Sequence, residues 1–284
     1  MTIIITILAS LLVFGAVIAI HEFGHFAAAK LSGIQVNEFA IGMGPALWKK
    51  IAGGTQYTLR LLPVGGYVAM EGEGSPESNQ AERARDGQPE EEAENPIPPD
   101  QRTGIPFPEA AIWKRAIVMA AGPLMNFVLG FVVLVGLIAF RPEPIASRVI
   151  YEVEEGALCG QTGLEAGDEI VAINGRRCFV ANDILYELAR TRDTQADFTV
   201  RRDGKLVELP AVRFDSYTDE DGNTRMDIGF TVYALAKTPA NVLKESVNSE
   251  LYYSRIIFTS VADLLRGRES INNLSGPVGI VSAI

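Results

Sequence analysis

The chain has 284 residues, of which 48% are hydrophobic and 21% are charged. This length allows one to three domains, and the apolar content excludes a disordered, collagen-like or disulfide-knot protein. The formal net charge of −10 argues against a nucleic-acid partner. Most of this charge is local, because residues 71–100 contain ten Asp or Glu and two Arg.

The N-terminal segment predicts a membrane-spanning helix. Ile3–Ile20 carry no charge for 18 positions, and about 20 apolar residues are needed to span a bilayer. A signal peptide is disfavoured, because the segment has no basic start and no small-x-small cleavage site before a polar mature start. The segment runs on into residues 21–30, which carry polar groups, without a breaker. We therefore expect one helix and a first segment over residues 1–31.

The next two segments differ in composition. Residues 32–72 are predicted to be a membrane-associated β-like segment, because strand-like stretches alternate with turn-forming glycines such as Gly42 and Gly44. Residues 73–114 are rich in Pro, Glu, Ser, Gln and Gly. A segment of that composition cannot bury a core, so it is predicted to be a flexible acidic cytoplasmic loop.

A second membrane-spanning helix is predicted over residues 115–141, since Ala116–Phe140 are uncharged for 25 positions. Nine Lys or Arg lie between the two apolar spans, none precedes the first, and residues 141–158 contain only Arg141 and Arg148. The positive-inside rule therefore places residues 31–114 in the cytoplasm, and the N-terminus and the residues after 141 outside.

Residues 142–236 predict a compact soluble domain with several short strands, tight turns and one helix over residues 182–190. Its two cysteines, Cys159 and Cys178, form either one bridge or two free thiols. Residues 237–284 include an amphipathic stretch at 240–265, which predicts a helix that packs on the protein or lies on the membrane surface. The apolar, uncapped ending suggests that more chain follows.

The motif that carries chemistry is His21-Glu22-Phe23-Gly24-His25. Positions i and i+4 project from the same helix face, so the two imidazoles can bind one Zn²⁺. Glu22 can then take a proton from a water molecule held at the metal. His21 and His25 are the only histidines in the chain.

The position of this motif supports a functional interpretation. Ionisable groups within an apolar span are costly and usually functional, although the motif could instead lie among lipid headgroups as merely interfacial polar residues. Catalytic zinc usually takes three protein ligands, and local spacing reveals only two. The third would have to be an Asp or Glu, for which Asp263 is one candidate.

Five further stretches extend the pattern beyond the zinc motif, and the chain resembles the site-2 protease family of intramembrane zinc metalloproteases (peptidase family M50), of the bacterial RseP type with one PDZ domain. The resemblance implies a multi-pass α-helical membrane protein with a membrane-associated β-like segment and an inserted α+β PDZ domain. The similar stretches are Phe39–Pro45, the G-G-Y-V stretch in Leu62–Glu73, the G-P-x-x-N signature in Ala120–Phe127, the PDZ-type Thr162–Gly175, and Leu274–Ile280.

The resemblance implies a mechanism and its site residues. Zinc is held by His21 and His25, and Glu22 is the general base that prepares water to attack a transmembrane segment of a substrate. Gly42 and Gly44 allow an unwound substrate to approach an edge strand, or are simple turn glycines. Asn126 contacts substrate or the oxyanion, or instead makes a helix–helix hydrogen bond.

The implied partners are the lipid bilayer and transmembrane protein substrates, for example anti-sigma factors or signal-peptide remnants, in a bacterial inner or plasma membrane. The PDZ domain outside the membrane either binds a peptide ligand or excludes bulky substrates.

The sequence also departs from the family pattern. The family supplies its third zinc ligand from an L-D-G motif on a later membrane helix, and no Leu-Asp-Gly occurs in this chain. We therefore expect a truncated sequence that is inactive as given and an active intact protease, with a natural inactive relative as the alternative.

Two rival functions remain. One is a PDZ-bearing membrane adaptor without catalysis. The other is a soluble-type metallopeptidase anchored by its first helix, which ranks last because no metzincin-like or thermolysin-like third ligand follows residue 31.

Overall fold

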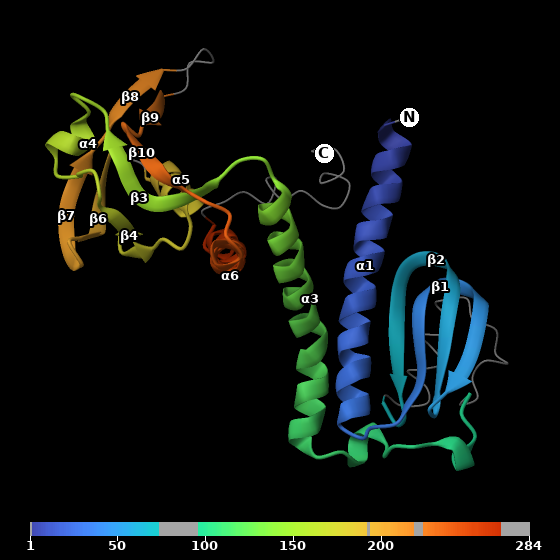
Figure 1. Ribbon diagram of the computed structural model, residues 1–284. Coiled ribbons are helices and arrows are strands. Elements are labelled where there is room, and N and C mark those ends of the chain that lie inside the picture. Colours follow the sequence, from blue (N-terminus) through green and yellow to red (C-terminus); the bar gives the residue numbers. More distant parts are fainter. Residues whose placement is uncertain (1, 74–95, 192–193, 219–223, 268–284) are drawn as a thin grey trace. The chain divides into compact units, whose positions relative to one another are not determined.

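A computed structural model describes residues 2–73, 96–191, 194–218 and 224–267 (Figure 1). The chain divides into two compact units, the first formed by Met1–Gly130 and the second by Phe131–Ile271 among the described residues. The expectations for residues 74–95 and 268–284, including most of the acidic loop, lie outside the described residues.

Two long apolar helices match the predicted spans. Helix α1 is Thr2–Leu31 and helix α3 is Ile112–Phe140. Both are long and apolar enough to cross a membrane, and only 6% of each apolar window is buried within the protein. Outward-facing apolar side chains of this kind suit a lipid environment, because a water-soluble helix would bury them.

Within the first unit, α1 and the first half of α3 run side by side in opposite directions (Figure 1). They approach closely at Gly24, where a methyl group added to the backbone would lie 2.4 Å from the carbonyl oxygen of Ala121. Small residues permit such close packing of membrane helices. The zinc motif of α1 is therefore held directly against α3.

The β-like segment is a hairpin of two long, bent strands, β1 (Val36–Ala52) and β2 (Thr55–Met70). The first half of β1 pairs with both halves of β2, and the second half of β1 pairs with the first half of β2. The hairpin thus forms four rows, with residues 66–70 and 46–52 on the outside. The sequence indicated only short strand-like pieces, because glycines and register shifts interrupt the alternating pattern at each bend.

A buried polar network holds the hairpin together. Arg60 donates to Tyr67 Oη at 2.8 Å and to the carbonyl oxygen of Gly44 at 2.9 Å, and Tyr67 Oη donates to Glu38 at 2.7 Å. Glu38 is only 7% exposed and Arg60 only 5%. Buried charges are tolerated when they are paired and hydrogen-bonded in this way.

Residues 96–111 pack on this sheet, although the sequence placed them in a flexible loop. They include two 3-10 turns, η2 (Pro99–Gln101) and η3 (Phe107–Glu109). The buried Gln35 side chain accepts hydrogen bonds from the backbone N–H groups of Thr103 and Gly104. Backbone hydrogen bonds of this kind are not encoded in composition, which explains why composition alone suggested a loop.

The second unit contains an α+β domain whose first strand begins at Ile145. Its main sheet has the order β10-β3-β4-β6-β7, with β5 beside β4, and β8 and β9 form a separate pair. Its elements are β3 (Ile145–Val153), α4 (Leu158–Gln161), β4 (Glu169–Ile173), β5 (Arg176–Arg177), α5 (Ala181–Ala189), β6 (Gln195–Arg202), β7 (Lys205–Arg213), β8 (Asp215–Thr218), β9 (Thr224–Asp227) and β10 (Phe230–Leu235).

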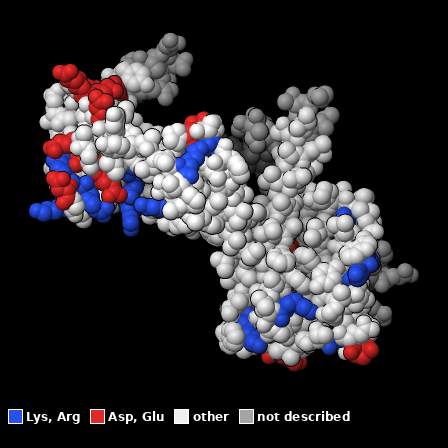
Figure 2. All heavy atoms as spheres, in the orientation of Figure 1, with Lys and Arg blue, Asp and Glu red and all other residues white. Residues whose placement is uncertain are grey.

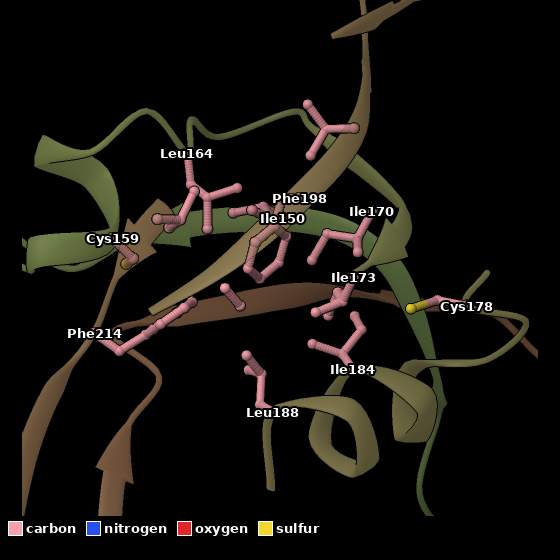
Figure 3. Packing of buried hydrophobic residues seen from close by; sticks show 13 residues of the cluster. Ile150, Cys159, Leu164, Ile170, Ile173, Cys178, Ile184, Leu188, Phe198 and Phe214 are labelled. Atoms are coloured by element: carbon pink, nitrogen blue, oxygen red, sulfur yellow. The ribbon is translucent and has the colours of Figure 1, made fainter. Parts of the chain in front are cut away.

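A single apolar cluster forms the core of this domain (Figure 3). Phe198, Ile150 and Ile173 are at most 1% exposed and lie at its centre. Cys159 and Cys178 are buried free thiols, and Figure 3 shows them on opposite sides of the cluster. In this structure the two cysteines therefore do not form the bridge that the sequence left open.

Charged side chains gather over the surface of the second unit (Figure 2). Asp168 is an exception, since it is 0% exposed. Its carboxylate accepts hydrogen bonds from Arg202 Nε at 2.7 Å and from Arg202 Nη2 at 2.8 Å. The same guanidinium contacts the exposed carboxylate of Glu165 at 2.7 Å. This pairing ties the turn before β4 to the end of β6.

The predicted amphipathic helix is α6 (Pro239–Leu265), and it packs on α5. Arg255 of α6 pairs with the buried Asp183, and Arg190 pairs with Asp263 at 2.5 Å. Asp263 is 3% exposed, and this ion pair accounts for its burial without a metal. The opposite face of α6 leaves large apolar side chains exposed, including Leu243, Val247, Leu251, Phe258, Val261 and Leu265.

Candidate metal centre

The two predicted zinc ligands lie together on one face of α1. His21 Nε2 and His25 Nε2 are 3.1 Å apart, and the two rings meet edge to face. Two nitrogens bound to one tetrahedral zinc through bonds of about 2.0–2.1 Å are separated by roughly 3.3 Å. The observed separation is therefore close to the one that a shared metal ion requires.

Helix α3 supplies the other wall of the site. A methyl group added at Gly122 would lie 2.3 Å from His25 Nε2 and 2.8 Å from His21 Nε2. The missing side chain of Gly122 thus leaves open the space toward which both nitrogens point. Pro123 follows directly within the helix and has no N–H to donate to the preceding turn.

Hydrogen bonds from α3 orient the two imidazoles. His25 Nδ1 lies 2.7 Å from the backbone carbonyl oxygen of Val118, and His21 Nδ1 lies 3.3 Å from Asn126 Nδ2. A carbonyl oxygen only accepts, so His25 carries its proton on Nδ1 and directs the lone pair of Nε2 away from Val118. Metal-binding histidines commonly have this second partner.

The predicted general base lies against the hairpin. The half-buried Glu22 carboxylate accepts a hydrogen bond from the backbone N–H of Val68, and its Cγ is 3.6 Å from where a methyl group on Gly66 would stand. Both residues belong to the outer row of β2. One side of the carboxylate is therefore fixed by an edge strand, beside the histidine pair.

The residues present fit a zinc ion, but they do not complete its coordination. Two imidazole nitrogens converge on an open space, and a carboxylate lies on the same helix turn. Among the described residues, no group of three or more His, Cys, Asp or Glu is arranged to hold a metal ion. His21 and His25 would supply two of the usual three ligands.

Gly42 and Gly44 lie at the bend of β1, with φ of 90° and 82°. A methyl group on Gly42 would lie 2.4 Å from the carbonyl oxygen of Leu62, so the close approach there is made by the hairpin's own β2. Nothing lies within 4 Å of a methyl group on Gly44. The structure thus groups Asn126, but not these glycines, with the histidines.

Sequence reasoning missed three parts of the site. The Val118 carbonyl and the Val68 N–H are backbone groups, which any residue type could supply, so no sequence signal marks them. Gly122 was different, because it stood in the G-P-x-x-N signature that the sequence analysis singled out. Its spacing of four residues from Asn126 places both on one helix face and could have suggested a joint role.

Comparisons with known proteins identify the family of the chain. The family model described as "Peptidase family M50" matches residues 9–283. The chain belongs to peptidase family M50. The match includes residues of both units, and M50 proteases are membrane proteins.

Two curated relatives align over nearly the whole chain. "Regulator of sigma-W protease RasP" of Bacillus subtilis is 28% identical over 97% of this chain and 78% of its own length. A Clostridium perfringens protein named "Putative zinc metalloprotease CPE1693" is 31% identical over 97% of this chain and 73% of its own length. The relatives of this M50 member are thus named as proteases and as zinc enzymes.

A solved PDZ domain, that of the SdrC-like protein from Listeria innocua, is similar to part of this M50 member. It is 16% identical, covers 32% of this chain and 99% of its own, and has a TM-score of 0.26.

Proposed function

We propose that this M50 member is a zinc-dependent intramembrane endopeptidase that cleaves transmembrane segments of other proteins. The observation that carries the proposal is the convergence of His21 Nε2 and His25 Nε2, 3.1 Å apart, beside the Gly122 backbone. This pair lies within a helix long and apolar enough to cross a membrane. Ionisable groups at such a place are expected to be functional.

In this proposal the chain's own residues transfer the proton and bind the substrate. Zinc, when bound, supplies Lewis acidity and lowers the pKa of a water molecule. Glu22 accepts the proton of the attacking water through the carboxylate oxygen that Val68 does not hold, and it can then protonate the leaving amine. The outer row of β2 offers backbone groups to an unwound substrate, since a helical substrate hides its carbonyls.

The proposal includes a topology. Lys30 lies in the last turn of α1 and Lys114 in the first turn of α3, and Lys114 Nζ donates to the carbonyl oxygen of Ser32 at 2.8 Å. Cationic residues therefore gather where both helices meet. By the positive-inside rule we place this end in the cytoplasm, and the α+β domain outside a bacterial inner or plasma membrane. There it would bind a peptide ligand or exclude bulky substrates.

The substrate class also belongs to the proposal. A relative is named a regulator of sigma-W protease, which supports membrane-anchored anti-sigma factors as substrates. Gly42 and Gly44 remain proposed substrate-binding positions, because they shape the bend of β1, and β1 pairs with the outer row of β2 that would meet the unwound chain.

Cleavage of a single-span substrate by the full-length protein in detergent or liposomes tests the proposal. We expect Glu22→Gln to abolish cleavage while the protein still binds zinc, because the base is lost but both imidazoles remain. Glu143→Gln is the matched control, since Glu143 is exposed beyond the end of α3. Cleavage by Glu22→Gln at the wild-type rate would overturn the proposal, and a wild type that binds substrate without cutting it would favour the adaptor.

A further inference from the structure

The Asn126 amide stands out among the polar groups of the site. Its Nδ2 lies 3.3 Å from His21 Nδ1. Its Oδ1 is buried and has no hydrogen-bond partner within the described part of the chain. A buried acceptor without a partner is costly and asks for an explanation.

The protons of the two imidazoles follow from their partners. His25 carries its proton on Nδ1, because the Val118 carbonyl can only accept. His25 Nε2 is then an acceptor, so the 3.1 Å contact requires His21 to donate from Nε2. His21 Nδ1 is thereby left as an acceptor, and Asn126 Nδ2 donates to it. The orientation of the Asn126 amide matches this arrangement and leaves Oδ1 without a hydrogen-bond partner among the described residues.

Metal binding requires the opposite tautomer of His21. Both Nε2 atoms must then present lone pairs, so the His21 proton has to lie on Nδ1, where it needs an acceptor. Turning the Asn126 side chain by about 180° around its last bond exchanges the positions of Oδ1 and Nδ2. The oxygen that lacked a partner then accepts from His21 Nδ1, and no backbone movement is required.

We propose that Asn126 is a positioning residue for His21. Its side-chain oxygen accepts the Nδ1 proton and so presents the Nε2 lone pair to the metal, as the Val118 carbonyl does for His25. This inference rests on the proposed zinc-dependent function. The rotated Nδ2 then has no partner among the described residues, so it can still donate to a substrate carbonyl, in line with the substrate contact expected for Asn126.

Zinc affinity of the full-length protein in detergent, measured by competition with a chelator of known affinity, tests the proposal. Asn126→Leu removes the acceptor, and we expect zinc to bind about 10- to 100-fold more weakly. Asn126→Asp keeps an acceptor oxygen but loses both N–H donors, and we expect its zinc affinity to stay within about threefold of the wild type. The visible spectrum of the cobalt-substituted protein should follow the same order.

Gly136→Ala serves as the matched control. Gly136 lies on the same helix as Asn126, and a methyl group added there would meet nothing within 4 Å. Thermal unfolding before metal is added shows whether each variant folds, and Asn126→Ala replaces the leucine variant if that one does not fold. Equal zinc affinity in Asn126→Leu and the wild type would overturn the positioning role. Equal weakening in the leucine and aspartate variants would do the same. A wild type that binds no zinc would instead overturn the proposed function.

Discussion

The long apolar helices of the first unit and the α+β domain of the second unit expose opposite kinds of groups. In the first unit, α1 and α3 expose Leu8, Leu12 and Leu124 to the surroundings, each at least 60% exposed, while His21 and His25 face inward. In the second unit, apolar side chains fill the centre and charged groups cover the surface (Figures 2 and 3). The contrast is the one expected if the surrounding medium decides which groups are buried, because lipid solvates apolar side chains and water solvates charged ones.

The difference also appears in how each unit handles a buried polar group. The second unit saturates Asp168 with an arginine and a backbone N–H. The first unit instead leaves the buried Asn126 Oδ1 without a hydrogen-bond partner among the described residues, and it directs the Nε2 atoms of His21 and His25 at the space beside Gly122. Incomplete satisfaction of this kind is expected where a ligand binds, and complete satisfaction where a group is structural.

The largest expected effect comes from filling the open space beside Gly122 in the first unit. In Gly122→Ala, the new methyl group would meet both Nε2 atoms, at 2.3 Å and 2.8 Å, so the rings must move apart. A displacement of about 1 Å can cost about 100-fold in rate. We expect cleavage to fall at least about 100-fold and zinc to be lost, as measured by cleavage assay and elemental analysis. Gly136→Ala should behave like the wild type, and an active, zinc-loaded Gly122→Ala would show that the metal lies elsewhere.

The second unit can be tested through the two acids that share Arg202. Removing a partner from a buried ion pair costs about 3–5 kcal/mol, whereas an exposed pair contributes about 1 kcal/mol or less. Asp168→Ala should therefore raise the alkylation rate of the buried cysteines at least about 100-fold, because it populates the unfolded domain. Glu165→Gln should change that rate less than about fivefold. Comparable effects of the two variants would contradict the assignment of Asp168 as a structural, saturated group.

The smallest effect concerns Cys178, whose side chain lies in the apolar core. Burial raises the pKa of this thiol from its ordinary value of 9.0 to about 11. The folded state therefore holds the proton more tightly, so its stabilisation is complete below pH 9 and is lost as the pH rises toward 11. Two pKa units correspond to about 2–3 kcal/mol.

Urea unfolding followed by circular dichroism at pH 9, 10 and 11 measures this loss. The difference between the wild type and Cys178→Ala isolates the thiol, because other groups titrate in both proteins. We expect the advantage of the wild type to shrink by about 2 kcal/mol over this range. An advantage independent of pH would mean that the thiol is accessible to water.

Much of this architecture could be predicted from the sequence. The first apolar span ends at Leu31 as expected, and the second ends at Phe140. Helix α6 was expected over residues 240–265 and is observed as Pro239–Leu265. These elements carry long, regular patterns, and such patterns fix a helix and its ends well.

Features that depend on tertiary contacts were harder to predict. Strand β10 (Phe230–Leu235) was not foreseen, because its pairing with β3 is what defines it. The two long, bent strands of the hairpin were predicted only as short strand-like pieces. In the site, the spacing of His21 and His25 predicted a shared face, but it could not reveal that a glycine on another helix makes room for the ligand.

The close contact of Gly24 with α3 changes how the signature pentapeptide should be read. Of its two unspecified positions, Phe23 is 43% exposed and faces away, whereas Gly24 touches the opposite backbone. The pattern therefore carries four constraints rather than three, and the fourth describes the neighbouring helix rather than the chemistry. A search pattern that demanded the smallest residue there would separate histidine pairs buried between two helices from those on an open surface.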